Sequence, residues 1–143
     1  MELSGNDRRI LAALSDNARM PVAELARRVN LSRSTVKQRL ERMERSGIIV
    51  GYSLRLGDDI ERQRLRAIVM IQADPKANAS IVRSLRSLEA VRELYAVNGL
   101  YDLSATLVVD STEDLDEALD TLGRLEGVEK TVSSIVLSTK IQR

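Results

Sequence analysis

The sequence predicts an α+β protein in which an N-terminal winged helix-turn-helix precedes a ferredoxin-like βαββαβ sandwich domain. Helically spaced apolar residues over about 1–46 and alternating strands and helices after residue 66 support this division. The charge also changes sign: residues 1–57 carry 11 Lys and Arg against 6 Asp and Glu, and residues 58–143 carry 11 against 15. A net charge of +5 in the first part and −4 in the second favours a first module that approaches phosphate groups.

Composition excludes several classes of function. The 143 residues include no Cys and no His, which removes disulfides, thiolate metal sites and the commonest general base. With three Tyr and no Phe or Trp, single-strand binding by base stacking is poorly supported. Because no apolar run reaches about 18 residues and no signal peptide opens the chain, we expect a cytoplasmic protein without a membrane partner or metal.

Three helices are expected in the first module. The first has Ser4 or Asn6 as its cap, the second begins at Pro21 and ends at Asn30, and the third runs from a cap at Ser32 to about Ser46. Their apolar stripes consist of Leu3, Ile10, Leu11 and Leu14, of Val22, Leu25, Ala26 and Val29, and of Val36, Leu40 and Met43.

The spacing of Ala26, Asn30 and Val36 is typical of a helix-turn-helix. A small residue allows a close helix crossing, Asn tolerates the left-handed turn, and a β-branched residue packs the second helix back on the first. A plain helical hairpin is the alternative. The outward face of the third helix favours DNA, because it carries hydroxyl, amide and cationic groups that reach base edges and phosphates. The predicted DNA-binding residues are Ser32, Arg33, Ser34, Lys37, Gln38 and Arg42.

Arg39 points nearer the core and is interpreted as a snorkelling or phosphate-binding side chain. After Gly47, the segment Ile48–Leu56 has strand propensity and is predicted to form a wing or a connecting strand. We place the DNA-binding domain at 1–53, a linker or connecting strand at 54–65, and the second domain at 66–143.

The second domain contains a duplicated βαβ unit. Strands are predicted at Ala67–Ala73, Val91–Val97, Leu103–Val109 and Val128–Ile141, with a helix in each of the two long connections. The two halves repeat at intervals of 36 and 37 residues, so that Leu88-Glu89-Ala90-Val91 matches Leu125-Glu126-Gly127-Val128. Tandem βαβ units place both helices on one face of the sheet, and the bare face then predicts a dimer.

The stretch LSGNDRRILAALSDNARMPVAELARRVNLSRSTVKQRLERMERSGIIVGY resembles the N-terminal signature of the Lrp/AsnC family, the leucine-responsive and asparagine-responsive transcriptional regulators. The later Gly-Leu-Tyr-Asp and the ferredoxin-like tail look like the ligand-sensing, oligomerising domain of that family. The resemblance implies binding to double-stranded DNA, homodimers that assemble further into octamers, and an amino acid or related metabolite between dimers. Asn30 departs from the Gly usual in the family.

The resemblance also implies an effector site around the turn Gly99, Leu100, Tyr101 and Asp102. It adds a polar pair on the next helix, matched by Asp116 and Asp120, and hydroxyls on the last strand, matched by Thr131 and Ser133. Carboxylates suit an α-ammonium, and backbone N–H groups and hydroxyls suit an α-carboxylate. The alternative is that the turn only closes a hairpin and that the Asp pair is a solvated face.

Two other functions are weighed against amino-acid sensing. Sirohaem decarboxylases share the architecture, but their chemistry depends on His, which this chain lacks, so we expect neither an enzyme nor a cofactor. An architectural protein that binds DNA without an effector shares every N-terminal feature and differs only at the turn and the helix acids. That reading stays open.

Overall fold

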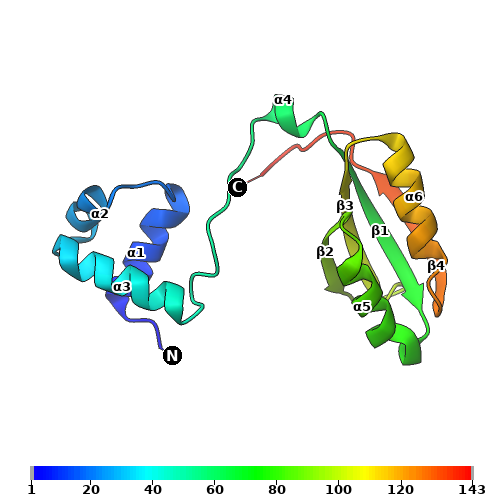
Figure 1. Ribbon diagram of the computed structural model, residues 1–143, viewed down its shortest axis with the longest axis horizontal. Coiled ribbons are helices and arrows are strands. Elements are labelled where there is room, and N and C mark those ends of the chain that lie inside the picture. The colour runs from blue at the N-terminus through cyan, green and yellow to red at the C-terminus, as the bar shows by residue number, and fades with distance from the viewer. Residues whose placement is uncertain (1, 143) are drawn as a thin grey trace. The chain divides into compact units, whose positions relative to one another are not determined.

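The computed structural model describes residues 2–142 and divides the chain into two compact units, one up to Arg55 and one from Leu56 (Figure 1). The first unit is built from α1 (Gly5–Asp16), α2 (Val22–Val29) and α3 (Arg33–Arg45). Its core comes from the three helices and the connection between α1 and α2, and it contains Ile10, Ala13, Met20, Leu25, Ala26, Val29, Val36 and Met43. The three predicted helices are therefore confirmed.

The helix boundaries follow local chemistry. Ser4 caps α1, since its hydroxyl accepts a hydrogen bond from the Asp7 N–H, and Ser32 caps α3 by accepting from the Thr35 N–H. Between α2 and α3, Asn30 adopts a left-handed backbone with φ of 57°. Asn is among the few residues besides Gly that enter this region readily, so it reverses the chain where the family resemblance predicted a Gly.

The predicted strand over Ile48–Leu56 is wrong for the single chain. Residues 48–57 contain no strand, and Val50 and Leu54 are almost fully exposed. An extended segment becomes a strand only when another strand takes up its backbone hydrogen bonds, and none in the described part of the chain does so. The segment is instead tied back locally, because the Tyr52 hydroxyl donates to the Glu44 carboxylate at 2.8 Å.

The second unit has the predicted ferredoxin-like topology. Its strands are β1 (Leu65–Ala73), β2 (Val91–Ala96), β3 (Leu103–Val109) and β4 (Val128–Ile135), arranged antiparallel in the order β2-β3-β1-β4. A 3-10 turn at Pro75–Ala77 leads into α5 (Asn78–Ser87), and α6 (Thr112–Gly123) precedes β4. Figure 1 shows α5 and α6 on the same side of the sheet.

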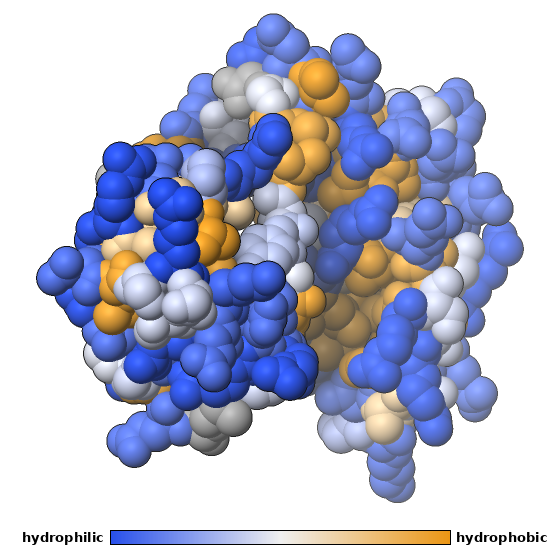
Figure 2. All heavy atoms as spheres, turned by 60° about the vertical axis from the view of Figure 1, so that its left-hand side comes forward, coloured by the Kyte–Doolittle hydropathy of each residue, from blue (hydrophilic) through white to orange (hydrophobic). Residues whose placement is uncertain are grey.

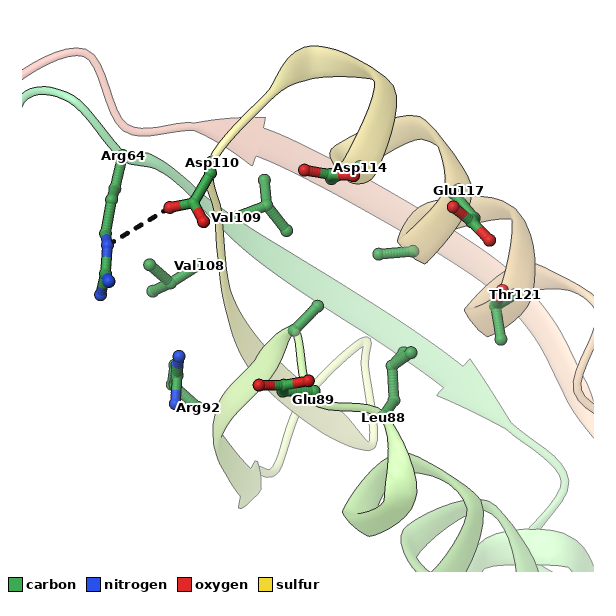
Figure 3. A pocket seen from close by; sticks show the side chains of 12 residues that line it. Arg64, Leu88, Glu89, Arg92, Val108, Val109, Asp110, Asp114, Glu117 and Thr121 are labelled. Atoms are coloured by element: carbon green, nitrogen blue, oxygen red, sulfur yellow. Dashed lines mark ion pairs between the residues drawn. The ribbon is translucent and has the colours of Figure 1, made fainter.

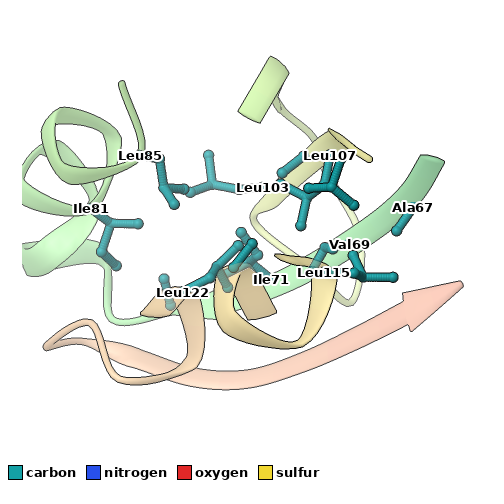
Figure 4. Close-up of a cluster of buried hydrophobic side chains, with 13 residues drawn as sticks. Ala67, Val69, Ile71, Ile81, Leu85, Leu103, Leu107, Leu115 and Leu122 are labelled. Atoms are coloured by element: carbon teal, nitrogen blue, oxygen red, sulfur yellow. The ribbon is translucent and has the colours of Figure 1, made fainter. Parts of the chain in front are cut away.

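Alternate residues of the central strands build the second core. Ala67, Val69, Ile71 and Ala73 of β1 are buried, as are Leu103, Ala105, Leu107 and Val109 of β3 (Figure 4). Ile81 and Leu85 from α5 and Leu115, Ala118 and Leu122 from α6 cover them. Because side chains alternate along a strand, the residues between these positions face the opposite, uncovered side.

Two features of this unit differ from the sequence prediction. A short helix, α4 (Asp58–Glu61), lies in the predicted linker. The last strand ends at Ile135, whereas Ile141 was expected. In the ladder with β1, Ile135 lies opposite Ala67, and the Val136 N–H donates to the Arg66 carbonyl. Pairing with β4 therefore ends within two residues of the start of β1 at Leu65.

Candidate functional site

The outward face of α3 is the first candidate site. Ser32, Arg33, Ser34, Lys37, Gln38 and Arg42 are all exposed, while Val36 and Met43 are buried against α1 and α2. The helical spacing therefore predicted correctly which side of α3 is free. Ser32 also has a local role, because its hydroxyl lies 2.7 Å from that of Thr35 and holds the first turn of the helix.

Arg42 is less free than the sequence suggested. Its Nη2 lies 2.7 Å from Oδ2 of Asp7 on α1, and Arg39 Nη1 lies 3.0 Å from Asp7 Oδ1. Arg42 is exposed, as its place on the outward face of α3 predicts, but one of its nitrogens is held by a carboxylate inside the unit. The Arg39 side chain does lie toward the core, as predicted, and its partner is this same carboxylate.

Asp7 itself was missed in the sequence analysis. Its side chain is 1% exposed, and it is the single buried charged residue in the described part of the chain. The Ser4 hydroxyl donates to Asp7 Oδ2 at 2.7 Å, and the Ser4 N–H donates to the same oxygen at 3.0 Å. This reciprocal capping box has a sequence signal, a Ser followed three residues later by an acidic residue.

The environment of Asp7 keeps it ionised. The hydrogen bond from the Ser4 hydroxyl, aided by the Ser4 N–H, Arg39 and Arg42, holds the pKa of the Asp7 carboxyl far below its usual range. Burial acts in the opposite direction, but it does not prevail. A permanent negative charge therefore lies beneath the flank of α3.

The second candidate site surrounds the β2–β3 turn. Gly99 has φ of 119°, a conformation that L side chains rarely adopt, and a Cβ there would meet no atom of the chain within 4 Å. Leu100 is 86% exposed, and Tyr101 is half-buried. The turn thus presents open backbone and a free leucine to the outside.

Asp102 has a structural role within the chain. Its Oδ2 accepts a hydrogen bond from the Ala73 N–H at 2.8 Å, and its own N–H donates to the Ile71 carbonyl at 2.9 Å. These bonds attach the turn to the end of β1. A role of Asp102 toward an ammonium group stays a prediction, and one of its carboxylate oxygens already has a donor within the chain.

The remaining predicted effector residues lie on the helix-covered side of the sheet. Thr131 and Ser133 pair with Ile71 and Val69, whose side chains are on that side, so both hydroxyls share one face as predicted. They stay exposed because β4 is an edge strand. Asp116 and Asp120 are exposed on α6, and Asp120 lies 3.7 Å from Arg124 in an ion pair.

None of these eight residues lines the cleft of about 400 Å³ drawn in Figure 3. That cleft lies where β3 ends and α6 begins. Its rim carries an ion pair of 3.4 Å between Arg64 and Asp110, and the acids Asp114 and Glu117 project from α6 beside it. The predicted effector residues are therefore presented on the surface of one chain and are not enclosed by it.

Comparisons with known proteins agree with this architecture over the whole chain. Residues 3–50 match the model of a winged helix-turn-helix DNA-binding domain, and residues 66–143 match that of the Lrp/AsnC ligand binding domain. The chain belongs to the Lrp/AsnC family. The HTH-type transcriptional regulator LrpA of Pyrococcus horikoshii is 31% identical over 132 residues, which cover 92% of this chain and 94% of that protein.

Solved structures of Lrp/AsnC regulators have the same fold. E. coli AsnC matches with a TM-score of 0.85 and 28% identity, covering 100% of this chain and 97% of its own. A feast or famine regulatory protein of M. tuberculosis complexed with L-methionine matches with a TM-score of 0.86 and 30% identity, covering 99% and 96%. A Neisseria meningitidis regulator in complex with L-Met matches with a TM-score of 0.85 and 28% identity, covering 99% and 94%.

As a member of the Lrp/AsnC family, the chain is a transcriptional regulator with a DNA-binding and a ligand-binding domain, and not an enzyme. Among residues 2–142 no helix is long and apolar enough to cross a membrane. The same described residues contain no group of three or more His, Cys, Asp or Glu that would hold a metal ion.

Proposed function

We propose that this Lrp/AsnC regulator reads specific double-stranded DNA through the outward face of α3. The observation that carries the proposal is the exposure of a polar, cationic face on the second helix of a helix-turn-helix whose opposite face is buried. Gln38 offers an amide for bidentate contact with adenine, while Arg33 and Lys37 offer cations for guanine or phosphate. The proposed contact residues are Ser32, Arg33, Ser34, Lys37, Gln38 and Arg42.

Selection of duplexes from a random library, first with the wild-type protein and then with Gln38→Ala, tests this assignment. Loss of the amide should relax base preference at one position of the site by about 1–3 kcal/mol. Arg86→Ala, an exposed change on α5 in the other unit, serves as control and should leave the selected sequence unchanged. Selection of the same sequence with the same affinity by Gln38→Ala would show that the reading face lies elsewhere.

We further propose that the protein forms homodimers through the uncovered side of its sheet, and that these dimers assemble into octamers of the chain. Tyr95, Ser104, Met70 and Val132 form one row across that side, by the register of the four strands. Tyr95 is 53% exposed and Val132 42% exposed, as is the neighbouring Ile68. Exposed hydrophobic residues lie in patches in Figure 2, and apolar surface of this kind marks protein contacts.

Sedimentation of the full chain tests the assembly. Val132→Asp places a charge at the β4 end of the row and should shift the protein toward monomers, whereas Ser84→Asp on the exposed side of α5 should not. The same oligomer in both variants at micromolar concentration would contradict an interface on this side of the sheet.

For the ligand-binding domain we propose an amino acid or related metabolite bound between dimers. The proposed effector residues are Gly99, Leu100, Tyr101, Asp102, Asp116, Asp120, Thr131 and Ser133. Their open arrangement on one chain supports a site that a neighbouring dimer completes. Two similar regulators bind L-methionine in their solved structures, which makes this amino acid the first to test.

Calorimetric titration with L-methionine and the other common amino acids decides this point. An amino acid present at a free concentration of 100 times its dissociation constant should add about 2.7 kcal/mol to the free energy of unfolding and raise the melting temperature. Asp120→Asn should weaken binding without unfolding the protein, because its side chain is exposed, and Glu117→Gln on the same helix is the matched control.

The second candidate is an effector-independent architectural protein of the same fold. The observation that favours it is the hydrogen bond from the Ala73 N–H to Asp102, which gives the turn a structural purpose. This reading predicts no heat with any common amino acid at millimolar concentration and near-neutral behaviour of Asp120→Asn. In both readings we expect the protein to act in the cytoplasm, where it has access to DNA.

A further inference from the structure

A buried negative charge lies directly beneath the helix that is proposed to read DNA. Asp7 is 1% exposed and receives two guanidinium groups from α3, at 2.7 Å from Arg42 and 3.0 Å from Arg39. Arg39 Nη1 also donates to the Ser4 hydroxyl at 3.1 Å. One end of α1 and the middle of α3 are thereby joined by charge-assisted hydrogen bonds, which are stronger and more directional than neutral ones.

The cations of α3 consequently fall into two groups. Arg33, Lys37 and Arg45 are exposed and have no ion pair within the described part of the chain. Arg42 is 45% exposed in its side chain, yet it is paired, and Arg39 is 26% exposed and paired. A guanidinium that already has a buried carboxylate partner must give up that charge-assisted hydrogen bond in order to bind a phosphate fully.

We propose that Asp7 is a positioning residue for DNA recognition, which holds Arg39 and Arg42 against α1 and so withholds Arg42 from non-specific phosphate contact. The inference rests on the proposed role of α3. Specificity is the ratio between the affinity for the correct site and the affinity for other DNA. Phosphate contacts supply essentially all of the affinity for other DNA. Restraining one cation at the flank of the reading face therefore favours discrimination.

The salt dependence of DNA binding separates restrained cations from free ones. Each cation that neutralises a phosphate adds about 0.9 to the slope of log affinity against log salt concentration. With a random duplex, Lys37→Gln should reduce this slope by about 0.9. Arg42→Gln should reduce it by less than half as much, because Arg42 is held by Asp7, and this variant keeps Asp7 paired with Arg39 and Ser4.

The converse experiment releases Arg42. Asp7→Asn keeps an oxygen for Ser4 but removes the charge, so the random duplex should bind several-fold more tightly and the slope should steepen by about 0.9. Asp16→Asn is the matched control: it adds the same net charge to the same unit by breaking the exposed pair between Asp16 and Arg28, and it should leave the specificity ratio near the wild-type value.

A double variant limits the destabilisation caused by Asp7→Asn and controls for the change in net charge. Asp7→Asn combined with Arg39→Gln restores the wild-type net charge and removes the second uncompensated guanidinium, while Arg42 stays released. Its ratio of affinities for a selected and a random duplex should remain several-fold below that of the wild type. Because net charge is unchanged, a general electrostatic effect would leave this ratio where it was.

Two failures are distinguishable. If the wild-type protein prefers no duplex from a random library, the proposed role of α3 itself is wrong. If the wild type does prefer one, and Arg42→Gln lowers the slope on a random duplex as much as Lys37→Gln does, Arg42 is a free cation and the role of Asp7 is overturned. A wild-type specificity ratio in the double variant would overturn it as well.

Discussion

The two units of the molecule stabilise their small cores by different kinds of interaction. The unit from Leu56 onward buries 13 hydrophobic side chains between its sheet and two helices and no charged group, among the residues described. The helical unit buries only 8 and adds the Asp7 carboxylate with its two arginines. Small domains bury a lower fraction of their surface, so each interaction inside them matters more.

This difference suggests that the helical unit depends on a polar cluster that also controls function. A buried ion pair adds little stability over well-packed hydrophobic residues, but it does impose a particular geometry when each partner is hydrogen-bonded. The sheet unit, whose core is apolar, owes its arrangement to side-chain alternation on the strands. We therefore expect the two units to respond very differently to mutation and to pH.

The largest expected effect is that of Asp7→Ala. The change leaves Arg39 and Arg42 without their carboxylate and removes half of the capping box at Ser4. Breaking a buried pair at one partner costs about 3–5 kcal/mol, and the half-exposed Arg42 places this case toward the lower end. Scanning calorimetry should show the transition of the helical unit at a lower temperature and that of the sheet unit unchanged.

The corresponding weak point of the sheet unit is Gly127. Its φ is 91°, and a Cβ there would collide with the Cβ of Ala77. The matching position of the first βαβ half is Ala90, so the repeat tolerates a side chain there but not here. Gly127→Ala should destabilise the sheet unit by about 2–3 kcal/mol from backbone strain and overlap, with Gly123→Ala, where space is open, as control.

A smaller effect is expected from acid. The folded-state pKa of Asp7 lies below its unfolded value, so its contribution is complete above that value and is lost as the pH falls below about 4. Denaturant titrations of the wild type should therefore show the helical unit weakening in this range. In Asp7→Asn this part of the pH dependence should be missing. An identical acid profile in both proteins would contradict the ionised state of Asp7.

The smallest effect belongs to Asp16→Asn. The pair with Arg28 spans 3.3 Å, but its side chains are 52% and 70% exposed. Exposed ion pairs contribute about 0–1 kcal/mol and are screened by salt. Chemical denaturation should show a change within this range that fades at high salt. A cost similar to that of Asp7→Ala would mean that burial does not distinguish the two pairs.

Periodicity and capping residues were enough to predict most of the fold. The three helices, the left-handed turn at Asn30 and strand β3 followed from local patterns that the tertiary structure respects. The strand expected at Ile48–Leu56 failed because pairing needs a partner that local propensity cannot supply. The early end of β4 has the same cause, since the length of a strand depends on its neighbour.

The candidate sites were predicted less completely. Helical spacing identified the exposed side of α3, but it did not reveal that Arg42 is paired, because Asp7 is 35 residues away in sequence. For the effector site, the family resemblance supplied the turn and the register confirmed that Thr131 and Ser133 share a face. The bond between Asp102 and Ala73 depends on how the turn folds against β1, which no sequence pattern encodes.

The central claim is that the helical unit binds DNA and the sheet unit binds the amino acid. Amide hydrogen exchange of the full chain, with and without a duplex selected from a random library, tests it most directly. We predict slower exchange in α3 and in the turn at 30–32 on adding DNA, and no change at 99–102 unless an amino acid is also present. Unchanged exchange in α3, or protection confined to the sheet unit, would contradict the account.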